Sequence, residues 1–334
     1  MLVADGIIYS LQRNGGITVY FNELLRRIKN YAADDAAMVL LCEGSFANME
    51  LFSSAFRIQP NRVAERYRRC KVPVKPSLFH SSYYRLPDQD VPVVTTVHDF
   101  IYERFASGPR RWVHSLHKFA AIRASTAIIC ISESTRRDLF CFLPDINPEH
   151  VHVVYNGVSE VFRPLAPCAT SSELARPFVL FVGGRNGYKN FRPLVRAIAF
   201  HSNVDLVCIG GGALTAQESE LLNYYLGDRF SHHMTVSNEE LNLFYNRAFC
   251  LVYPSAYEGF GIPVLEAMRA GCPVIAVDNS SIPEVTGDAA HLVSEASPEM
   301  LGEAITRLRK PDFRERYRQR GLKRALQFSW DRTF

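Results

Sequence analysis

The sequence predicts an α/β fold in which two domains each contain a parallel β-sheet with helices on both faces. Three observations predict it. Short apolar runs alternate with helix-like stretches along the whole chain. A segment rich in turn-forming residues, 156–172, separates these runs into two sets. The length of 334 residues also suits two domains of ordinary size better than one.

The first set of apolar runs predicts the strands of an N-terminal domain, residues 1–160, and the second set those of a C-terminal domain, residues 161–334. The expected N-terminal strands are 38–42, 78–79, 93–97, 127–131 and 151–154. The expected C-terminal strands are 178–182, 206–209, 249–253, 274–277 and 290–293. Each strand should be followed by a helix, as in other parallel sheets.

The composition is that of a soluble globular protein, and we expect it in the cytoplasm. No apolar run approaches the roughly twenty residues that span a bilayer, and no signal peptide is evident. A net charge of +4 is too small to indicate a nucleic-acid partner. Eight cysteines lack any Cys-x-x-Cys pair, and several, such as Cys130, Cys208 and Cys250, lie in apolar runs. They predict buried thiols, without metal or disulfide roles.

Positive charge and apolar side chains are concentrated in two segments of the N-terminal domain. Between Arg57 and Lys75 there are seven basic residues against Glu65 alone. In a predicted helix further along, one face carries apolar side chains, namely Trp112, Val113, Leu116 and Phe119. Its other positions include Arg110, Arg111, His114, Lys118 and Arg123. This pattern suits a helix lying at a membrane interface, and it suits an ordinary surface helix as well.

The most informative segment is the run from Tyr253 to Gly271, which ends a strand, turns through glycines and begins a helix. Pro263 suits the first turn of that helix and Gly271 its C-terminal end, so the helix has about two turns. Glu258 then lies in the loop and Glu266 on the helix. The glycines allow close approach of a ligand, and the helix N-terminus favours an anion.

Two carboxylates beside an anion site suit a nucleotide diphosphate sugar, because carboxylates accept hydrogen bonds from sugar hydroxyls. The alternative is an ordinary strand-loop-helix corner in which Glu258 caps the helix and Glu266 is merely solvated. Glu258 and Glu266, together with 255–268, 271–276, 282–285 and 287–290, resemble the signature of retaining GT-B glycosyltransferases of family 4.

This resemblance implies a GT-B fold, with two Rossmann-like domains whose parallel sheets face each other across a cleft. It implies that Glu258 contacts the donor sugar and Glu266 the ribose hydroxyls, both as ionised acceptors. The turn between them would also line the donor, through Gly259, Phe260 and Gly261. The family's last helix crosses back to the first domain, and here that helix is expected to be shortened or missing after Phe328.

A second motif follows the strand 178–182, where Arg185 and Lys189 are placed at the carboxyl end of the strand. The segment is neither a Walker loop nor a dinucleotide fingerprint. Standing alone it could be a surface turn with two solvated bases. It resembles the family's phosphate motif, which implies that both cations bind the diphosphate and stabilise the leaving group.

Three further segments resemble parts of the family's donor site. Gly15 and Gly16 open an amphipathic helix and would approach the diphosphate, or form a flexible turn. His98 ends the strand 93–97 and would contact the sugar, with Asp99 orienting it or ending the strand. Val236 lies in the stretch against the nucleotide base, although Ser237 or Asn238 as a helix cap explains that stretch nearly as well. Ser132 or Ser134 is a similar candidate cap.

The expected activity is transfer of a hexose, with retention of configuration, from a nucleotide diphosphate sugar to a glycan or lipid-linked acceptor in cell-surface polysaccharide synthesis. GDP-mannose is the favoured donor and a UDP-hexose the second. Neither a cofactor nor a metal is expected, since no Asp-x-Asp cluster occurs and Asp34 and Asp35 lie in a polar turn. Peripheral contact with the cytoplasmic membrane face is expected. The alternatives are a nucleotide-sugar epimerase, a phosphorylase or a non-catalytic binding subunit of the same fold.

Overall fold

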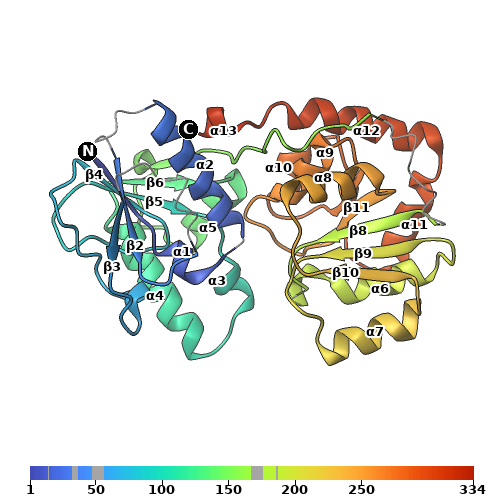
Figure 1. Cartoon of the computed structure of the whole chain (residues 1–334), viewed down its shortest axis with the longest axis horizontal. Coiled ribbons are helices and arrows are strands. Elements are labelled where there is room, and N and C mark those ends of the chain that lie inside the picture. Colours follow the sequence, from blue (N-terminus) through green and yellow to red (C-terminus); the bar gives the residue numbers. More distant parts are fainter. Residues whose placement is uncertain (14, 32–36, 47–55, 167–175, 186) are drawn as a thin grey trace. The chain divides into compact units, whose positions relative to one another are not determined.

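The computed structural model describes the 334-residue chain except for residues 14, 32–36, 47–55, 167–175 and 186 (Figure 1). The chain divides into two compact units. The first contains Met1–Asn156 and Trp330–Phe334, and the second contains Gly157–Ser329. Each unit contains one parallel sheet, so the two Rossmann-like domains predicted from the sequence are confirmed. Parts of the expected linker, together with Asn14, Asp34, Asp35 and Cys168, lie outside the described residues.

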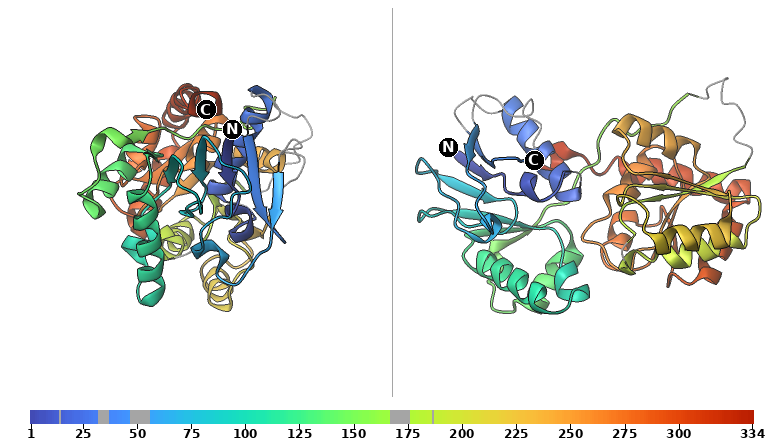
Figure 2. Two further views of the ribbon diagram at one scale, coloured as in Figure 1. Left: turned by 90° about the vertical axis from the view of Figure 1, so that its left-hand side faces the viewer. Right: turned by 60° about the horizontal axis from the view of Figure 1, so that its bottom comes forward.

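The sheet of the first unit has the order β3-β2-β1-β4-β5-β6-β7, and all pairs are parallel. Its strands are β1 Leu2–Asp5, β2 Ala37–Cys42, β3 Phe56–Gln59, β4 Leu78–Ser81, β5 Val93–Val97, β6 Ala127–Cys130 and β7 Val151–Val153. Its helices are α1 Ile8–Leu11, α2 Gly16–Tyr31, α3 Ile101–Phe105, α4 Pro109–Arg123, α5 Glu133–Phe142 and α13 Trp330–Thr333, with short 3-10 turns at η2 Glu65–Tyr67 and η3 Pro148–His150. Helices cover both faces of this sheet (Figures 1 and 2).

The second unit repeats the architecture with the strand order β10-β9-β8-β11-β12-β13, again wholly parallel. Its strands are β8 Phe178–Val182, β9 Asp205–Ile209, β10 Phe230–His233, β11 Cys250–Tyr253, β12 Val274–Val277 and β13 His291–Val293. Its helices are α6 Phe191–Ala199, α7 Ala216–Leu226, α8 Asn238–Arg247, α9 Ile262–Arg269, α10 Ile282–Thr286, α11 Pro298–Leu308 and α12 Pro311–Ala325, with a 3-10 turn at η4 Gly187–Lys189. Helices α6, α7 and α11 pack together, as do α8, α9, α10 and α12.

The core of the second unit explains why β8 and β11 lie at the centre of the sheet. Leu180 on β8 and Val252 on β11 are completely buried, as are Leu194 and Ile198 on α6. The strands are continuous apolar runs because both faces of a parallel sheet are covered. This places the carboxyl ends of β8 and β11 side by side.

The last described residues belong to the first unit, which differs from the domain limits expected from the sequence. Trp330 is buried, and its ring lies 6.1 Å from that of Tyr20 on α2. Asp331 accepts a 2.7 Å hydrogen bond from Arg27, and Thr333 donates one of 2.7 Å to the carbonyl of Tyr155. The chain therefore returns from α12 to the first unit through the short helix α13, and the second unit begins at Gly157.

The cysteines have the burial that the sequence predicts. All described cysteines are free, and all except Cys141 are buried, as the apolar runs predict. Within the described ranges, no helix combines the length and the apolar character needed to cross a bilayer.

Candidate functional site

The carboxyl ends of β8 and β11 position most of the predicted residues of the second unit. These strands are neighbours, and the loop after each one carries one member of an ion pair: Lys189 follows β8, and Glu258 follows β11. The two loops are joined by a hydrogen bond from Ala256 N to the carbonyl of Tyr188, at 2.8 Å. Ligands bind at this edge of open α/β sheets, so the site is where the topology predicts it.

Lys189 and Glu258 form a direct, largely buried ion pair. The Lys189 ammonium donates to Glu258 Oε1 and lies 3.5 Å from the hydroxyl of Tyr253. The rings of Tyr188 and Tyr253 are each 5.3 Å from the same ammonium. Aromatic faces and a carboxylate therefore surround this cation, and the pairing strengthens as water is excluded.

The loop that carries Glu258 is fixed by side chains following β12. Ser280 Oγ accepts a 2.9 Å hydrogen bond from Glu258 N. Ser281 Oγ donates to the carbonyls of Glu258 and Phe260, at 2.9 Å each. Asn279 binds the carbonyl of Ala256 at 2.6 Å. Because three consecutive polar residues satisfy this backbone, the loop presents Glu258 in one orientation.

Gly261 joins this loop to α9. Its φ is +104°, in the region that favours glycine, and a Cβ there would lie 2.9 Å from Ile282 Cδ1. Pro263 occupies the first turn of α9, and Gly271 follows the helix with φ +80°, as predicted. Gly259 and Phe260 complete the turn, and Phe260 is buried.

Glu266 lies on α9 and is partly buried. The hydroxyl of Tyr245 on α8 donates to Glu266 Oε2 at 3.0 Å. Burial raises the pKa of Glu266 to about 7, against the smaller opposing effect of the Tyr245 hydrogen bond. The carboxyl is thus poised to titrate near neutral pH, and Glu266 is not the merely solvated residue of the alternative interpretation.

Arg185 and Lys189 have different partners in the structure. The Arg185 guanidinium donates to the carbonyls of Gly210, Gly211, Gly212 and Ala213, at 2.7, 3.2, 3.1 and 2.9 Å. It also binds Glu218 at 3.0 Å. The three glycines all have positive φ, between +71° and +88°, which lets their carbonyls converge on the guanidinium. In this arrangement Arg185 organises the loop after β9, while Asn186 lies outside the described residues.

Val236 lies half-buried in the loop between β10 and α8, one residue before the helix cap. Ser237 is that cap, because its side chain accepts from Glu240 N and the Glu240 side chain accepts from Ser237 N. Of the two candidate caps, Ser237 is therefore the cap of α8, and Asn238 is the first residue of the helix. Ser132 likewise caps α5 by accepting from Thr135 N at 3.0 Å.

In the first unit, the predicted residues lie at the carboxyl ends of β1 and β5. Gly16 begins α2, and Val19 N donates to the carbonyl of Gly15 at 2.9 Å. A Cβ on Gly15 would lie 1.9 Å from Gln12 Oε1, so a larger residue would displace that side chain. Asp99 accepts from Ile101 N at 3.0 Å and so begins α3.

His98 is buried against α2, with its ring 5.2 Å from that of Tyr20. Burial is the main cause that lowers the pKa of His98 to about 3, so the imidazole is neutral. Among the described residues, its buried Nε2 has no hydrogen-bond partner. A buried polar atom without a partner is costly, and a ligand hydroxyl would satisfy it.

Comparisons with known proteins connect these features to a family. The model of glycosyl transferases group 1 matches residues 169–324, and that of Glycosyltransferase Family 4 matches residues 44–161. The α-maltose-1-phosphate synthase of Mycobacterium tuberculosis is 31% identical over 271 residues, covering 72% of this chain and 70% of that protein. The chain belongs to glycosyltransferase family 4.

A second relative and two solved structures are also similar to this chain. O-antigen chain mannosyltransferase B of Escherichia coli is 26% identical over 274 residues, covering 77% of this chain and 72% of that protein. Sucrose-phosphate synthase from Thermosynechococcus elongatus has a TM-score of 0.78 at 19% identity, covering 99% of this chain and 96% of that one. Anabaena HepE with UDP-glucose has a TM-score of 0.76 at 16% identity, with the same coverages. These two likenesses show the GT-B fold.

The sequence did not predict several residues that hold the candidate site together. Tyr245, Glu218 and the run Asn279–Ser281 have no motif of their own, and their partners lie 21 to 33 residues away in the chain. Only the capping pattern Thr215-x-x-Glu218 gave a local signal, and it explains α7 alone. No group of metal-binding side chains occurs among the residues that the structure describes.

Proposed function

We propose that this family 4 enzyme transfers a hexose, with retention of configuration, from a nucleotide diphosphate sugar to a glycan or lipid-linked acceptor in cell-surface polysaccharide synthesis. The observation that carries the proposal is the pairing of Lys189 with Glu258 at the carboxyl ends of adjacent strands, beside the N-terminus of α9. One cation and one helix N-terminus suit a diphosphate, and one carboxylate suits a sugar.

We propose that the donor exchanges partners within this pair. The diphosphate takes the Lys189 ammonium, and Glu258 then accepts hydrogen bonds from the sugar hydroxyls. Glu266, in its ionised form, accepts from the ribose hydroxyls. Gly15, Gly16 and His98 of the first unit, with Val236, Gly259, Phe260 and Gly261 of the second, are the remaining proposed donor contacts.

In the proposed reaction the acceptor oxygen bonds to the anomeric carbon on the face from which the diphosphate leaves. The bond between that carbon and the phosphate oxygen breaks, and the departing diphosphate takes the acceptor proton. Lys189 stabilises the negative charge that develops, an effect that typically contributes about a hundredfold to a thousandfold in rate. Neither a metal nor another cofactor is part of this proposal.

GDP-mannose is the favoured donor, supported by the relatives named O-antigen chain mannosyltransferase in Escherichia coli and Salmonella typhimurium. A UDP-hexose is the second candidate, because the structure of Anabaena HepE, which is similar in fold, contains UDP-glucose. A lipid-linked acceptor would bring the enzyme to a membrane surface as a peripheral protein.

The test is equilibrium binding of GDP, UDP, ADP and dTDP, with and without EDTA, to the wild type and to Glu266→Ala. We expect one nucleotide to bind tightly, EDTA to have no effect, and Glu266→Ala to weaken binding. Binding that needs magnesium or manganese would overturn metal independence, and no binding of any nucleotide would overturn the proposed donor site.

Turnover distinguishes the remaining alternatives. With donor and acceptor present, the product should keep the anomeric configuration of the donor, measured by NMR. Conversion of the donor in the absence of any acceptor would instead indicate an epimerase. A sugar covalently trapped on a side chain would contradict the same-face reaction.

A further inference from the structure

Tyr253 is a buried phenol at the candidate site to which the proposed reaction gives no role. It is the last residue of β11, and it is 3% exposed. Its hydroxyl lies at the carboxyl end of the strand, 3.5 Å from the Lys189 ammonium. A buried tyrosine hydroxyl usually has a hydrogen-bond partner, and phenylalanine would fill nearly the same space without one. The hydroxyl itself therefore requires an explanation.

The contact between this hydroxyl and Lys189 is a long one. At 3.5 Å it exceeds the usual range of roughly 2.7–3.2 Å for an N–H···O hydrogen bond. In that contact the hydroxyl oxygen accepts, so the phenolic proton can be donated to another group. Burial, and after it the negative charge of Glu258, raises the pKa of Tyr253 well above its ordinary value. The hydroxyl is therefore protonated at neutral pH and is a hydrogen-bond donor.

The Glu258 carboxylate is the acceptor that suits this donor. Glu258 Oε1 and the Tyr253 hydroxyl both contact the Lys189 ammonium, so the carboxylate and the phenol lie close together around one cation. The Glu258 side chain is 10% exposed and the Lys189 side chain 13%. A carboxylate with so little exposure is costly unless a cation or a donor satisfies it. In the ion pair, Lys189 satisfies Glu258.

Binding of the proposed donor would change the partners of Glu258. The diphosphate would take the Lys189 ammonium, and the Glu258 carboxylate would lose its cation while it remains inside the site. The Tyr253 hydroxyl is a donor already in place for one carboxylate oxygen, which leaves the other oxygen for the sugar hydroxyls. A neutral phenol suits this position, because a second cation would hold the carboxylate in an ion pair and compete with the sugar.

We propose that Tyr253 is a positioning residue, whose hydroxyl donates to Glu258 once the diphosphate has taken Lys189 and so keeps the carboxylate directed at the sugar. The inference rests on the proposed function, since it needs a donor with both a diphosphate and a sugar. Tyr253 transfers no proton and acts through Glu258. With a nucleoside diphosphate alone, water can occupy the place of the sugar and solvate Glu258. The hydroxyl therefore matters most when the sugar is present and water is excluded.

The test is Tyr253→Phe, which removes the hydroxyl and keeps the ring. The nucleoside diphosphate that binds the wild type should bind this variant within about threefold of the wild-type affinity. The value of kcat/KM for the nucleotide sugar should fall about tenfold to a hundredfold, as expected for loss of a hydrogen bond to a charged group. Tyr253→Phe combined with Glu258→Gln should lose no more activity than Glu258→Gln alone, because the phenol acts through the carboxylate. Thermal unfolding checks that each variant folds.

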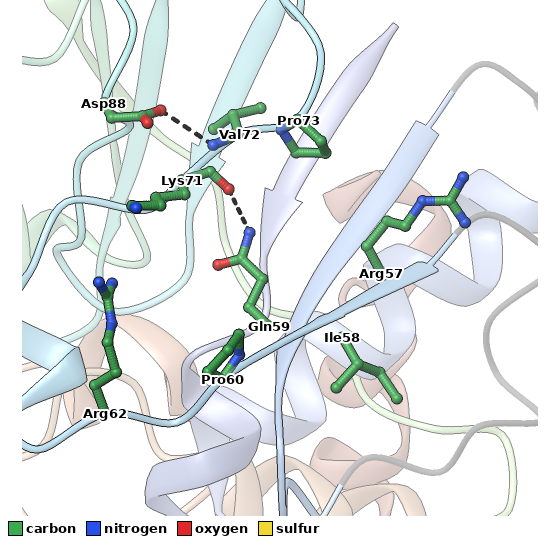
Figure 3. Close-up of a pocket in the computed structure, with 9 residues that line it drawn as sticks. All are labelled: Arg57, Ile58, Gln59, Pro60, Arg62, Lys71, Val72, Pro73 and Asp88. Atoms are coloured by element: carbon green, nitrogen blue, oxygen red, sulfur yellow. Dashed lines mark hydrogen bonds between the residues drawn. The ribbon is translucent and has the colours of Figure 1, made fainter.

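Two further variants are controls. Tyr224→Phe removes a hydroxyl from a side chain on α7 that is 81% exposed, and it should change neither quantity. Lys71→Gln tests a second basic region, because Arg57, Arg62 and Lys71 line a pocket of about 560 Å³ in the first unit that could also attract a diphosphate (Figure 3). Lys71→Gln should leave the nucleotide affinity unchanged, which would assign the measured binding to the site of Lys189.

The possible results separate this inference from the proposed function. A wild type that transfers no sugar from any nucleotide donor would overturn both. An active wild type together with an equally active Tyr253→Phe would overturn the inference alone. The inference would also be wrong if the losses in Tyr253→Phe and Glu258→Gln were additive, or if Tyr253→Phe lost as much nucleotide affinity as kcat/KM. Either result would mean that the ring and hydroxyl only support the packing of the site.

Discussion

At the scale of single residues, the Lys189–Glu258 pair shows how a binding site can hold its own charges before a ligand is present. Each partner satisfies the other, so neither is left as an unpaired buried charge. A diphosphate would have to displace Glu258 from the ammonium. In the proposed site Glu258 would therefore oppose nucleotide binding while preparing the sugar contact.

This competition predicts that the two members of the pair have opposite effects on binding. Glu258→Gln should bind the nucleoside diphosphate as tightly as the wild type or several-fold more tightly, yet lose about a hundredfold or more in kcat with the sugar donor. Lys189→Gln should weaken nucleotide binding and also lower kcat. Calorimetry with the nucleotide and steady-state rates measure the two quantities, and weaker nucleotide binding by Glu258→Gln would contradict the exchange of partners.

Glu266 predicts a pH dependence, because its pKa is raised to about 7 and the proposed ribose contact needs the ionised form. Nucleotide affinity should therefore rise with pH through about 7 and level off above it. The free energy of unfolding should depend on pH in the opposite direction to the nucleotide affinity. The folded pKa lies above the ordinary 4.5, so this group's contribution is full below pH 4.5 and is lost as pH rises through 7.

Tyr245 provides the control for this dependence, since its hydroxyl stabilises the ionised carboxyl. Tyr245→Phe should move the midpoint of affinity to higher pH, and Glu266→Gln should remove the dependence. An unchanged midpoint in Tyr245→Phe would argue against Glu266 as the titrating group.

At the scale of elements, loops rather than strands determine the geometry of the candidate site. The sequence predicted Glu258, Glu266 and Lys189 on the correct elements, because strand ends and glycines are local signals. It did not predict the surroundings of Arg185. The carbonyls around its guanidinium come from a loop 25 to 28 residues later, which only the packing of β8 beside β9 brings close.

We predict that Arg185→Ala releases this carbonyl loop and lowers turnover by about a hundredfold or more. Hydrogen exchange of residues 210–213 should accelerate, because several carbonyls lose their donor at once. Arg185→Lys should fail to restore protection, since one ammonium cannot replace a planar guanidinium. Unchanged exchange together with lost activity would indicate direct phosphate binding instead.

The turn before α9 gives a stability prediction. Gly261→Ala should destabilise the second unit by about 1–3 kcal/mol, since φ is positive and Ile282 lies in the way. Gly187→Ala is the matched control, because nothing lies within 4 Å of its Cβ position and its φ lies outside the positive range. Thermal unfolding should show a lowered Tm for the first variant and an equal or slightly raised one for the second.

At the scale of the whole molecule, apolar runs sufficed to predict ten of the thirteen described strands. The other three are β1, β3 and β10. The last two are edge strands with polar residues, such as His232 and Arg57, so they lack the apolar signal of buried strands. β1 lies inside the sheet, but its apolar run is only Leu-Val-Ala and ends at Asp5. The return of α13 to the first unit depends on contacts between residues 310 positions apart, which no local pattern reveals.

That return gives a further prediction. Trp330→Ala should destabilise the first unit by about 3–5 kcal/mol, because it removes a buried ring from α2. Trp112→Ala should change stability by no more than about 0.5 kcal/mol, since this ring is mostly exposed. The stability changes of the two variants can be measured by urea unfolding, and hydrogen exchange of α2 shows whether the change lies in the first unit. Equal effects of the two substitutions would contradict the packing of α13.

The same return also affects how the protein is made. Residues 330–334 leave the ribosome only after the whole of Gly157–Ser329 has been synthesised. At about 5–20 residues per second this takes on the order of ten seconds or more, during which α2 lacks its cover. The first unit is therefore completed only after the second has been translated, and nascent chains should expose the Tyr20 surface to chaperones until residues 330–334 have emerged.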